Sequence, residues 1–137
     1  MKVVIDSNRV IAAMIKDSTT RDILFDNNLE FIAPDTIKVE VNKYKTAIIE
    51  KAGVTEEEFD ILLSLIFQHI AIIPQNEYNE LVAKFKNEIK DFNDIPYIAV
   101  CVATKAEGIW THDPHFKQQK KVKVFTNIDL LKISKKN

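Results

Sequence analysis

Four acidic residues, spread over the length of the chain, could combine into one site: Asp6, Glu40, Asp94 and Asp113. Carboxylates gathered without cations repel one another and raise one another's pKa. Hard divalent cations such as Mg²⁺ or Mn²⁺ relieve this repulsion, because they prefer oxygen ligands and commonly join carboxylates to substrate phosphates. We therefore expect a divalent-metal site if the fold brings the four acids together.

Two of these acids follow apolar segments that have the character of buried strands. Three β-branched residues, Val3–Ile5, run directly into Asp6, and Ile109–Thr111 precedes Asp113 by one residue. An apolar run without polar alternation is typical of a strand covered on both faces in a parallel sheet. The carboxyl ends of such strands are where open α/β sheets bind ligands, so Asp6 and Asp113 are expected to flank one crevice.

The other two acids are expected on helices. Asp94 opens the apolar helix predicted over Ile95–Ala106, whose first turn would point at the same crevice. Glu40 lies one turn into a long helix predicted over 35–52, on the border of its apolar stripe.

Each acid also has a simpler interpretation. Asp6 and Asp94 could cap the helices that follow them, Asp113 could form a turn before Pro114, and Glu40 could be a solvated residue on a helix flank. Convergence of all four at one sheet edge is much harder to explain in these terms.

Strands separated by helices run through the rest of the chain. Capping-box patterns at Thr19 with Asp22 and at Thr55 with Glu58 predict two helix starts, and an apolar stripe predicts a helix over Tyr78–Ile89. Such alternation implies parallel crossovers, and hence a doubly wound, three-layer α/β/α sandwich in a single domain over residues 1–137. The predicted strands are Val3–Ile5, Glu30–Ala33, Ile70–Ile73, Ile109–Thr111 and Val122–Phe125.

Composition restricts the environment and the partners. No apolar run could span a bilayer, and Met1-Lys2 followed by three apolar residues is no signal peptide, so we expect no membrane association. The single Cys101 excludes an internal disulfide and fits a reducing cytoplasm. The net charge is −1; if four carboxylates bind metal ions, the remainder carries −1 + 4 = +3, which is compatible with a nucleic-acid substrate.

Four motifs in order resemble those of the PIN domain family, and the resemblance covers essentially the whole chain. They are Val4-Ile5-Asp6-Ser7-Asn8, Glu40, Asp94-Ile95-Pro96-Tyr97-Ile98-Ala99, and Trp110-Thr111-His112-Asp113-Pro114-His115-Phe116. Single pieces are weak signals, whereas the ordered set at these separations is specific. In size the chain is similar to the stand-alone prokaryotic PIN proteins, which include the VapC-type toxins.

This resemblance implies a metal-dependent ribonuclease whose acidic quartet is the four residues named above. Mg²⁺ or Mn²⁺ would be bound by Asp6, Asp94 and Asp113, with Glu40 binding metal through water or orienting the attacking water. Two metal ions could activate a water and stabilise the leaving oxygen of a phosphodiester. The residues that match supporting positions are Ser7 and Thr111, small hydroxyls that would hold ligands or phosphate, and Asp91, an additional acid upstream of Asp94.

Basic residues near the motifs could contact phosphate: Arg9, and Lys117 at the start of a basic run that is otherwise typical of a solvated face. His112 and His115 flank Asp113, but with no cysteine or third histidine nearby they are a poor zinc motif.

The sequence suggests partners and is compatible with other functions. The apolar segment Ile61–Phe67 suggests a homodimer, and the toxin resemblance implies an antitoxin partner beside the RNA substrate. Other interpretations are an RNA-processing nuclease without an antitoxin, a non-cleaving binding module, and a phosphotransfer domain with Asp6 as acceptor. The last is disfavoured, because the second acid wanted two residues later is Asn8.

Overall fold

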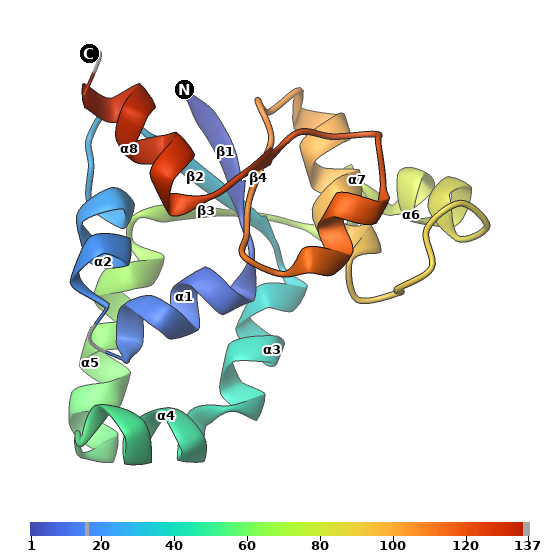
Figure 1. Cartoon of the computed structure of the whole chain (residues 1–137). Coiled ribbons are helices and arrows are strands. Elements are labelled where there is room, and N and C mark those ends of the chain that lie inside the picture. Colours follow the sequence, from blue (N-terminus) through green and yellow to red (C-terminus); the bar gives the residue numbers. More distant parts are fainter. Residues whose placement is uncertain (16, 136–137) are drawn as a thin grey trace.

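Five parallel strands form one sheet in the computed structural model, which describes residues 1–15 and 17–135 (Figure 1). The strand order is β3-β2-β1-β4-β5, so β1 is central and β4 lies directly beside it. The chain builds outward from β1 to β3 and then returns to place β4 and β5 on the other side, which confirms the doubly wound prediction. The strands are β1 (Lys2–Ile5), β2 (Glu30–Pro34), β3 (Ile70–Ile73), β4 (Ile109–Trp110) and β5 (Val124–Phe125).

Helices cover both faces of this sheet. On one face α7 packs across β1, β2 and β4, with α6 against it; α1, α2, α5 and α8 lie on the other side (Figure 1). The apolar runs are buried as expected: Val3, Val4 and Ile5 have no exposed surface, because both faces of β1 are covered. The helices are α1 (Ser7–Met14), α2 (Ser18–Leu24), α3 (Thr36–Lys43), α4 (Lys45–Ala52), α5 (Glu56–Phe67), α6 (Asn79–Phe85), α7 (Ile95–Thr104) and α8 (Asn127–Lys135), with short 3₁₀ turns η1 (Gln75–Glu77) and η2 (Pro114–Gln118).

The long helix predicted over 35–52 is wrong, because the chain breaks at Tyr44 into α3 and α4. The backbone of Tyr44 leaves the helical region (φ −101°, ψ 11°), and its side chain is exposed rather than part of the inward stripe. Ile37 and Ile48 are both buried, but on two differently directed helices. The apolar spacing identified the buried residues correctly and could not show the change of axis.

Several predicted helix boundaries also differ. The capping box at Thr19 is wrong: Asp17 caps α2 by accepting from the Thr20 N–H at 3.0 Å. The helix predicted over Tyr78–Ile89 ends at Phe85, which leaves a loop before α7. By contrast, the capping box of Thr55 with Glu58 is present in full at the start of α5.

The end of α7 shows why Gly108 is needed. The helix closes at Lys105, which takes the left-handed conformation (φ 57°), and Gly108 follows in the connection to β4. A Cβ at Gly108 would lie 2.6 Å from the Lys123 carbonyl oxygen, so glycine allows β5 to approach β4. Within residues 1–15 and 17–135, no helix is long and apolar enough to cross a membrane.

Candidate active site

A cavity of about 310 Å³ at the carboxyl edge of the sheet brings the predicted acids together. Four separate segments supply them: the ends of β1 and β4, the second turn of α3, and the start of α7. The lining residues that the sequence singled out are Asp6, Ser7, Glu40, Asp91, Asp94 and Asp113. Thr111 adjoins the cavity through Asp6, because its hydroxyl donates to the Asp6 carboxylate.

Asp6 is fixed at the end of β1 by β4. Its backbone N–H donates to the Trp110 carbonyl at 3.0 Å, and its carboxylate accepts from the Thr111 hydroxyl at 2.7 Å. Although Asp6 occupies the N-cap position of α1, its side chain makes no capping hydrogen bond, so the simpler interpretation as a helix cap does not account for it. Burial raises the pKa of Asp6 to about 6 against the opposing Thr111 bond, and Glu40 adds to the rise.

The Thr111 hydroxyl links three parts of the site. Besides donating to Asp6, its oxygen accepts from the Asn8 side-chain amide at 3.3 Å and from the Asp113 N–H at 3.0 Å. This buried hydroxyl therefore holds the end of β1, the first turn of α1 and the residues after β4 in one arrangement.

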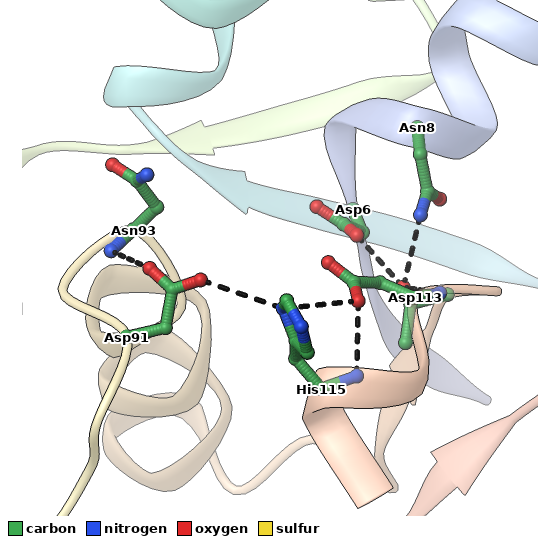
Figure 2. Close-up of polar contacts among 7 residues, drawn as sticks. Asp6, Asn8, Asp91, Asn93, Asp113 and His115 are labelled. Carbon is green, nitrogen blue, oxygen red and sulfur yellow. Dashed lines mark hydrogen bonds and ion pairs between the residues drawn. The ribbon is translucent and has the colours of Figure 1, made fainter.

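Asp113 and Asp91 face each other across the ring of His115 (Figure 2). Nδ1 of His115 lies 3.5 Å from an Asp113 oxygen and 3.7 Å from an Asp91 oxygen. Asp113 also accepts from the His115 N–H at 2.9 Å, so the turn interpretation of Asp113 holds at the same time. Asp91 accepts from the Asn93 N–H at 2.9 Å and thereby shapes the turn that leads into α7.

Glu40 enters the cavity from α3 and is tied to α1. One of its oxygens accepts from the Ser7 hydroxyl at 2.9 Å. Half-buried in this position, Glu40 has a pKa raised above its ordinary value, chiefly by burial. The Tyr97 hydroxyl lies beside Ser7 and Glu40, and it is buried without a partner in hydrogen-bonding geometry within the described part of the chain.

Asp94 is the least compensated of the acids. It occupies the N-cap position of α7, is only 7% exposed, and makes no capping hydrogen bond. Burial and then the neighbouring carboxylates raise its pKa to about 7, and His115 opposes the rise. A buried carboxylate that attracts protons so strongly is one that a cation would also stabilise.

The donor set of this cavity fits a divalent cation. Its carboxylates are the hard oxygen ligands that Mg²⁺ and Mn²⁺ prefer, and the unpartnered Tyr97 hydroxyl can satisfy a group brought in with the ion. In residues 1–15 and 17–135 no three His, Cys, Asp or Glu side chains yet meet as a closed metal cage.

Two basic residues that were predicted to contact phosphate lie outside the cavity lining. Arg9 donates from Nε to Asn8 at 3.1 Å and contacts the Thr20 hydroxyl, so it supports Asn8 from behind. Lys117 is exposed on η2. The cation that does line the cavity is Lys43 at the end of α3, a position with no sequence motif to mark it.

Three further residues at the site were not expected from the sequence: Asn8, Tyr97 and His115. All three stand inside the quoted motifs, but no role at the site was assigned to them: Asn8 was otherwise noted as a mismatch to a phosphotransfer motif, Tyr97 has the spacing of a core residue, and His115 is typical of a surface histidine. Their place in the motifs, and for His115 its position two residues after Asp113, were the available signals.

The comparisons with known proteins agree with this fold. The family model described as PIN domain matches residues 4–127, and the chain therefore belongs to the PIN domain family. Among solved structures it is similar to a chain of VapBC2 from Rickettsia felis bound to a DNA fragment from their promoter. That similarity has a TM-score of 0.67 over 92% of this chain and 98% of that chain, with 18% sequence identity. A sequence comparison with proteins of curated function gave no match.

Proposed function

We propose that this protein is a metal-dependent endoribonuclease that hydrolyses RNA phosphodiester bonds. The observation that carries the proposal is the meeting of Asp6, Glu40, Asp94 and Asp113, from four segments of the chain, in one cavity at the sheet edge. Membership of the PIN domain family supports it, and the motif resemblance implies that these four acids form the family's acidic quartet.

Asp6, Asp94 and Asp113 would hold Mg²⁺ or Mn²⁺. When bound, such ions would supply positive charge that acidifies an attacking water and stabilises the phosphodiester oxygens. Thr111 positions Asp6, and Ser7 positions Glu40, which would orient the attacking water. Asp91 would support the first turn of α7 through its bond to Asn93.

Basic side chains around the cavity would bind the RNA backbone. Lys43 lines the cavity and is the nearest candidate, with Arg9 and Lys117 further out. Each would attract phosphate without distinguishing bases.

We further propose that the protein is the toxin of a toxin–antitoxin pair and acts in the cytoplasm. The similar Rickettsia felis structure is of VapBC2 with promoter DNA, which suggests a cognate partner protein here. Ile61 and Leu65 on α5 are 56% and 48% exposed, which suits a homodimer contact. Size-exclusion chromatography giving a monomer at micromolar concentration would count against the dimer.

The test of the ribonuclease proposal is cleavage of several RNAs by the purified chain with Mg²⁺, with Mn²⁺ and with EDTA. We expect cleavage that needs the metal and is lost in Asp6→Asn, while Asp22→Asn, an exposed acid on α2, retains it. Cleavage in EDTA, or cleavage unchanged in Asp6→Asn, would contradict the proposal. Absence of cleavage after any copurifying antitoxin is removed would favour a non-cleaving module.

A further inference from the structure

A second, larger cavity of about 930 Å³ adjoins the acidic one and shares Asp91, Asn93 and Asp94 with it. One wall is the loop between α6 and α7, and the other is η2 with His115 and Gln118. The volume is within the range of pockets that bind small ligands. A polymer held across the acidic cavity would therefore place its next unit in this groove.

The chemistry of the groove suits a nucleobase. Phe92 lines it and is 68% exposed, and the side chain of Ile89, which also lines it, is almost fully buried. Aromatic faces and apolar floors bind the flat surface of a base, and polar groups at the wall can bind its edge. The exposed Gln118 on the opposite wall supplies an amide for that purpose.

Both walls are held in place by internal contacts. The side chain of Gln119 donates to the Phe116 and Val122 carbonyls at 2.8 and 3.0 Å, which fixes the end of η2. Asp91 and Asn93 flank Phe92 in the sequence, and the Asp91 carboxylate accepts from the Asn93 N–H at 2.9 Å. This bond closes the turn that carries the aromatic ring.

The charge of the outer wall is also compatible with a nucleic acid. Glu88 lies 3.0 Å from the ammonium of Lys121, so this acid is compensated and Lys90 remains as an exposed cation in the groove lining. Phosphate groups that enter along this outer wall therefore meet the paired Glu88 and the cation of Lys90 before they reach the acidic cavity.

We propose that this groove binds an unpaired nucleobase of single-stranded RNA, stacked on Phe92, next to the phosphodiester in the acidic cavity. This inference rests on the proposed function for its choice of polymer. Bases inside a duplex are paired and stacked, so a double-stranded RNA cannot use the groove. Stacking tolerates all four bases, and the groove contributes affinity more than sequence preference.

The test is a binding titration of the full chain with a short fluorescent single-stranded RNA and with the same RNA annealed to its complement. Ca²⁺ replaces Mg²⁺ so that binding is read without turnover. Because stacking on one aromatic ring contributes about 1–3 kcal/mol per base, Phe92→Ala should raise Kd for the single strand by about tenfold. Phe92→Trp should keep Kd within about twofold and report binding by quenching of the introduced indole. The matched control is Ile128→Ala, an equally exposed residue on α8 that should change nothing.

Each result of this titration supports or overturns the assignment of the groove to a nucleobase. A single-strand Kd that is unchanged in Phe92→Ala, an equal effect on the duplex, or no binding by the wild type would overturn the groove assignment. Loss of a copurifying protein in Phe92→Ala without loss of RNA affinity would assign the groove to that partner and also overturn it. Single-strand binding that depends on Phe92 in a protein that cleaves no RNA would support the groove and refute the ribonuclease.

Discussion

The two sides of the acidic cavity differ in how their charges are compensated. On the β1–β4 edge, Asp6 accepts from Thr111 at 2.7 Å and Asp113 accepts from the His115 N–H at 2.9 Å. On the turn formed by residues 91–94, Asp91 is bonded to Asn93, but Asp94 makes no capping bond and has a pKa of about 7. The edge is thus organised by its own hydrogen bonds, whereas Asp94 carries a charge that the described part of the chain leaves uncompensated.

This difference indicates what each side contributes. Residues of the edge fix geometry before any ligand arrives, so their loss should disturb both the site and the fold. The buried charge of Asp94 lowers the stability of the metal-free protein, and cation binding should restore that stability. Loss of the Thr111 hydroxyl on the edge and loss of the Asp94 charge on the turn should therefore change activity in the same direction and stability in opposite directions.

The largest effect is expected for Asp94→Asn. It should lower RNA cleavage by more than about 100-fold, since it removes a proposed ligand, and raise the free energy of unfolding in EDTA by about 1–2 kcal/mol, since it removes an uncompensated charge. Denaturant unfolding and cleavage rates measure the two. Asp22→Asn should change neither, and a destabilised Asp94→Asn would show that this charge is compensated after all.

Thr111→Val should lower cleavage by about 10–100-fold, because Asp6 loses the hydroxyl that positions it. Unlike Asp94→Asn, it should also destabilise the fold, by about 1–3 kcal/mol, since the Asp113 N–H and the Asn8 amide lose their acceptor. Thr111→Ser keeps the hydroxyl and should restore most of the activity. Equal losses in both variants would mean that the hydroxyl alone does not account for the role of Thr111.

The stability of the metal-free protein should depend on pH with a sign set by the raised acids. The pKa of Asp6 is about 6 and that of Asp94 about 7 in the folded state, above the value of about 3.9 for an unfolded aspartate. Between pH 5 and 8 the folded state therefore binds more protons than the unfolded one, and stability should fall by about 4 kcal/mol as pH rises. Thermal unfolding in EDTA measures this, and saturating Mg²⁺ should flatten the profile. A metal-free protein that becomes more stable toward pH 8 would contradict the assignment.

The smallest effect is expected for Tyr97→Phe, which removes only the unpartnered hydroxyl next to Ser7 and Glu40. Stability in EDTA should change by less than about 1 kcal/mol, because this hydroxyl has no partner in full hydrogen-bonding geometry but lies close to Ser7 and Glu40. Cleavage should nevertheless fall several-fold, since that hydroxyl would help to hold Glu40 in the metal-loaded site. Unchanged cleavage would make Tyr97 a core residue only.

The sequence predicted the edge of the site better than the turn. Asp6 and Asp113 could be placed because a buried strand shows in its apolar run and parallel strands present their ends at one edge. The pairing of β1 with β4 then brings the two acids together as expected. Asp94 was placed by the same logic at the start of α7.

Contacts that depend on changes of chain direction could not be predicted. Nothing in the sequence marks the break at Tyr44 or the end of α6 at Phe85, because neither is at a proline or glycine. The loop released by that early end carries Phe92, whose exposure beside the site could not be predicted for the same reason. The positions of His115 and Tyr97 depend on packing between segments that are distant in sequence. The ring of Tyr97 on α7 packs against Phe116 on η2, and the ring of His115 on η2 lies beside Asp91.

The most direct test of the account is calorimetric titration of the metal-free chain with Mn²⁺ at pH 6, in two buffers of different ionisation enthalpy. We expect binding with release of protons, because acids with a pKa of about 6 and about 7 must give up their protons to bind a cation. Binding should be weakened strongly in Asp6→Asn and Asp94→Asn and unchanged in Asp22→Asn. No binding, or binding that neither substitution weakens, would contradict the claim that these acids form a divalent-metal site.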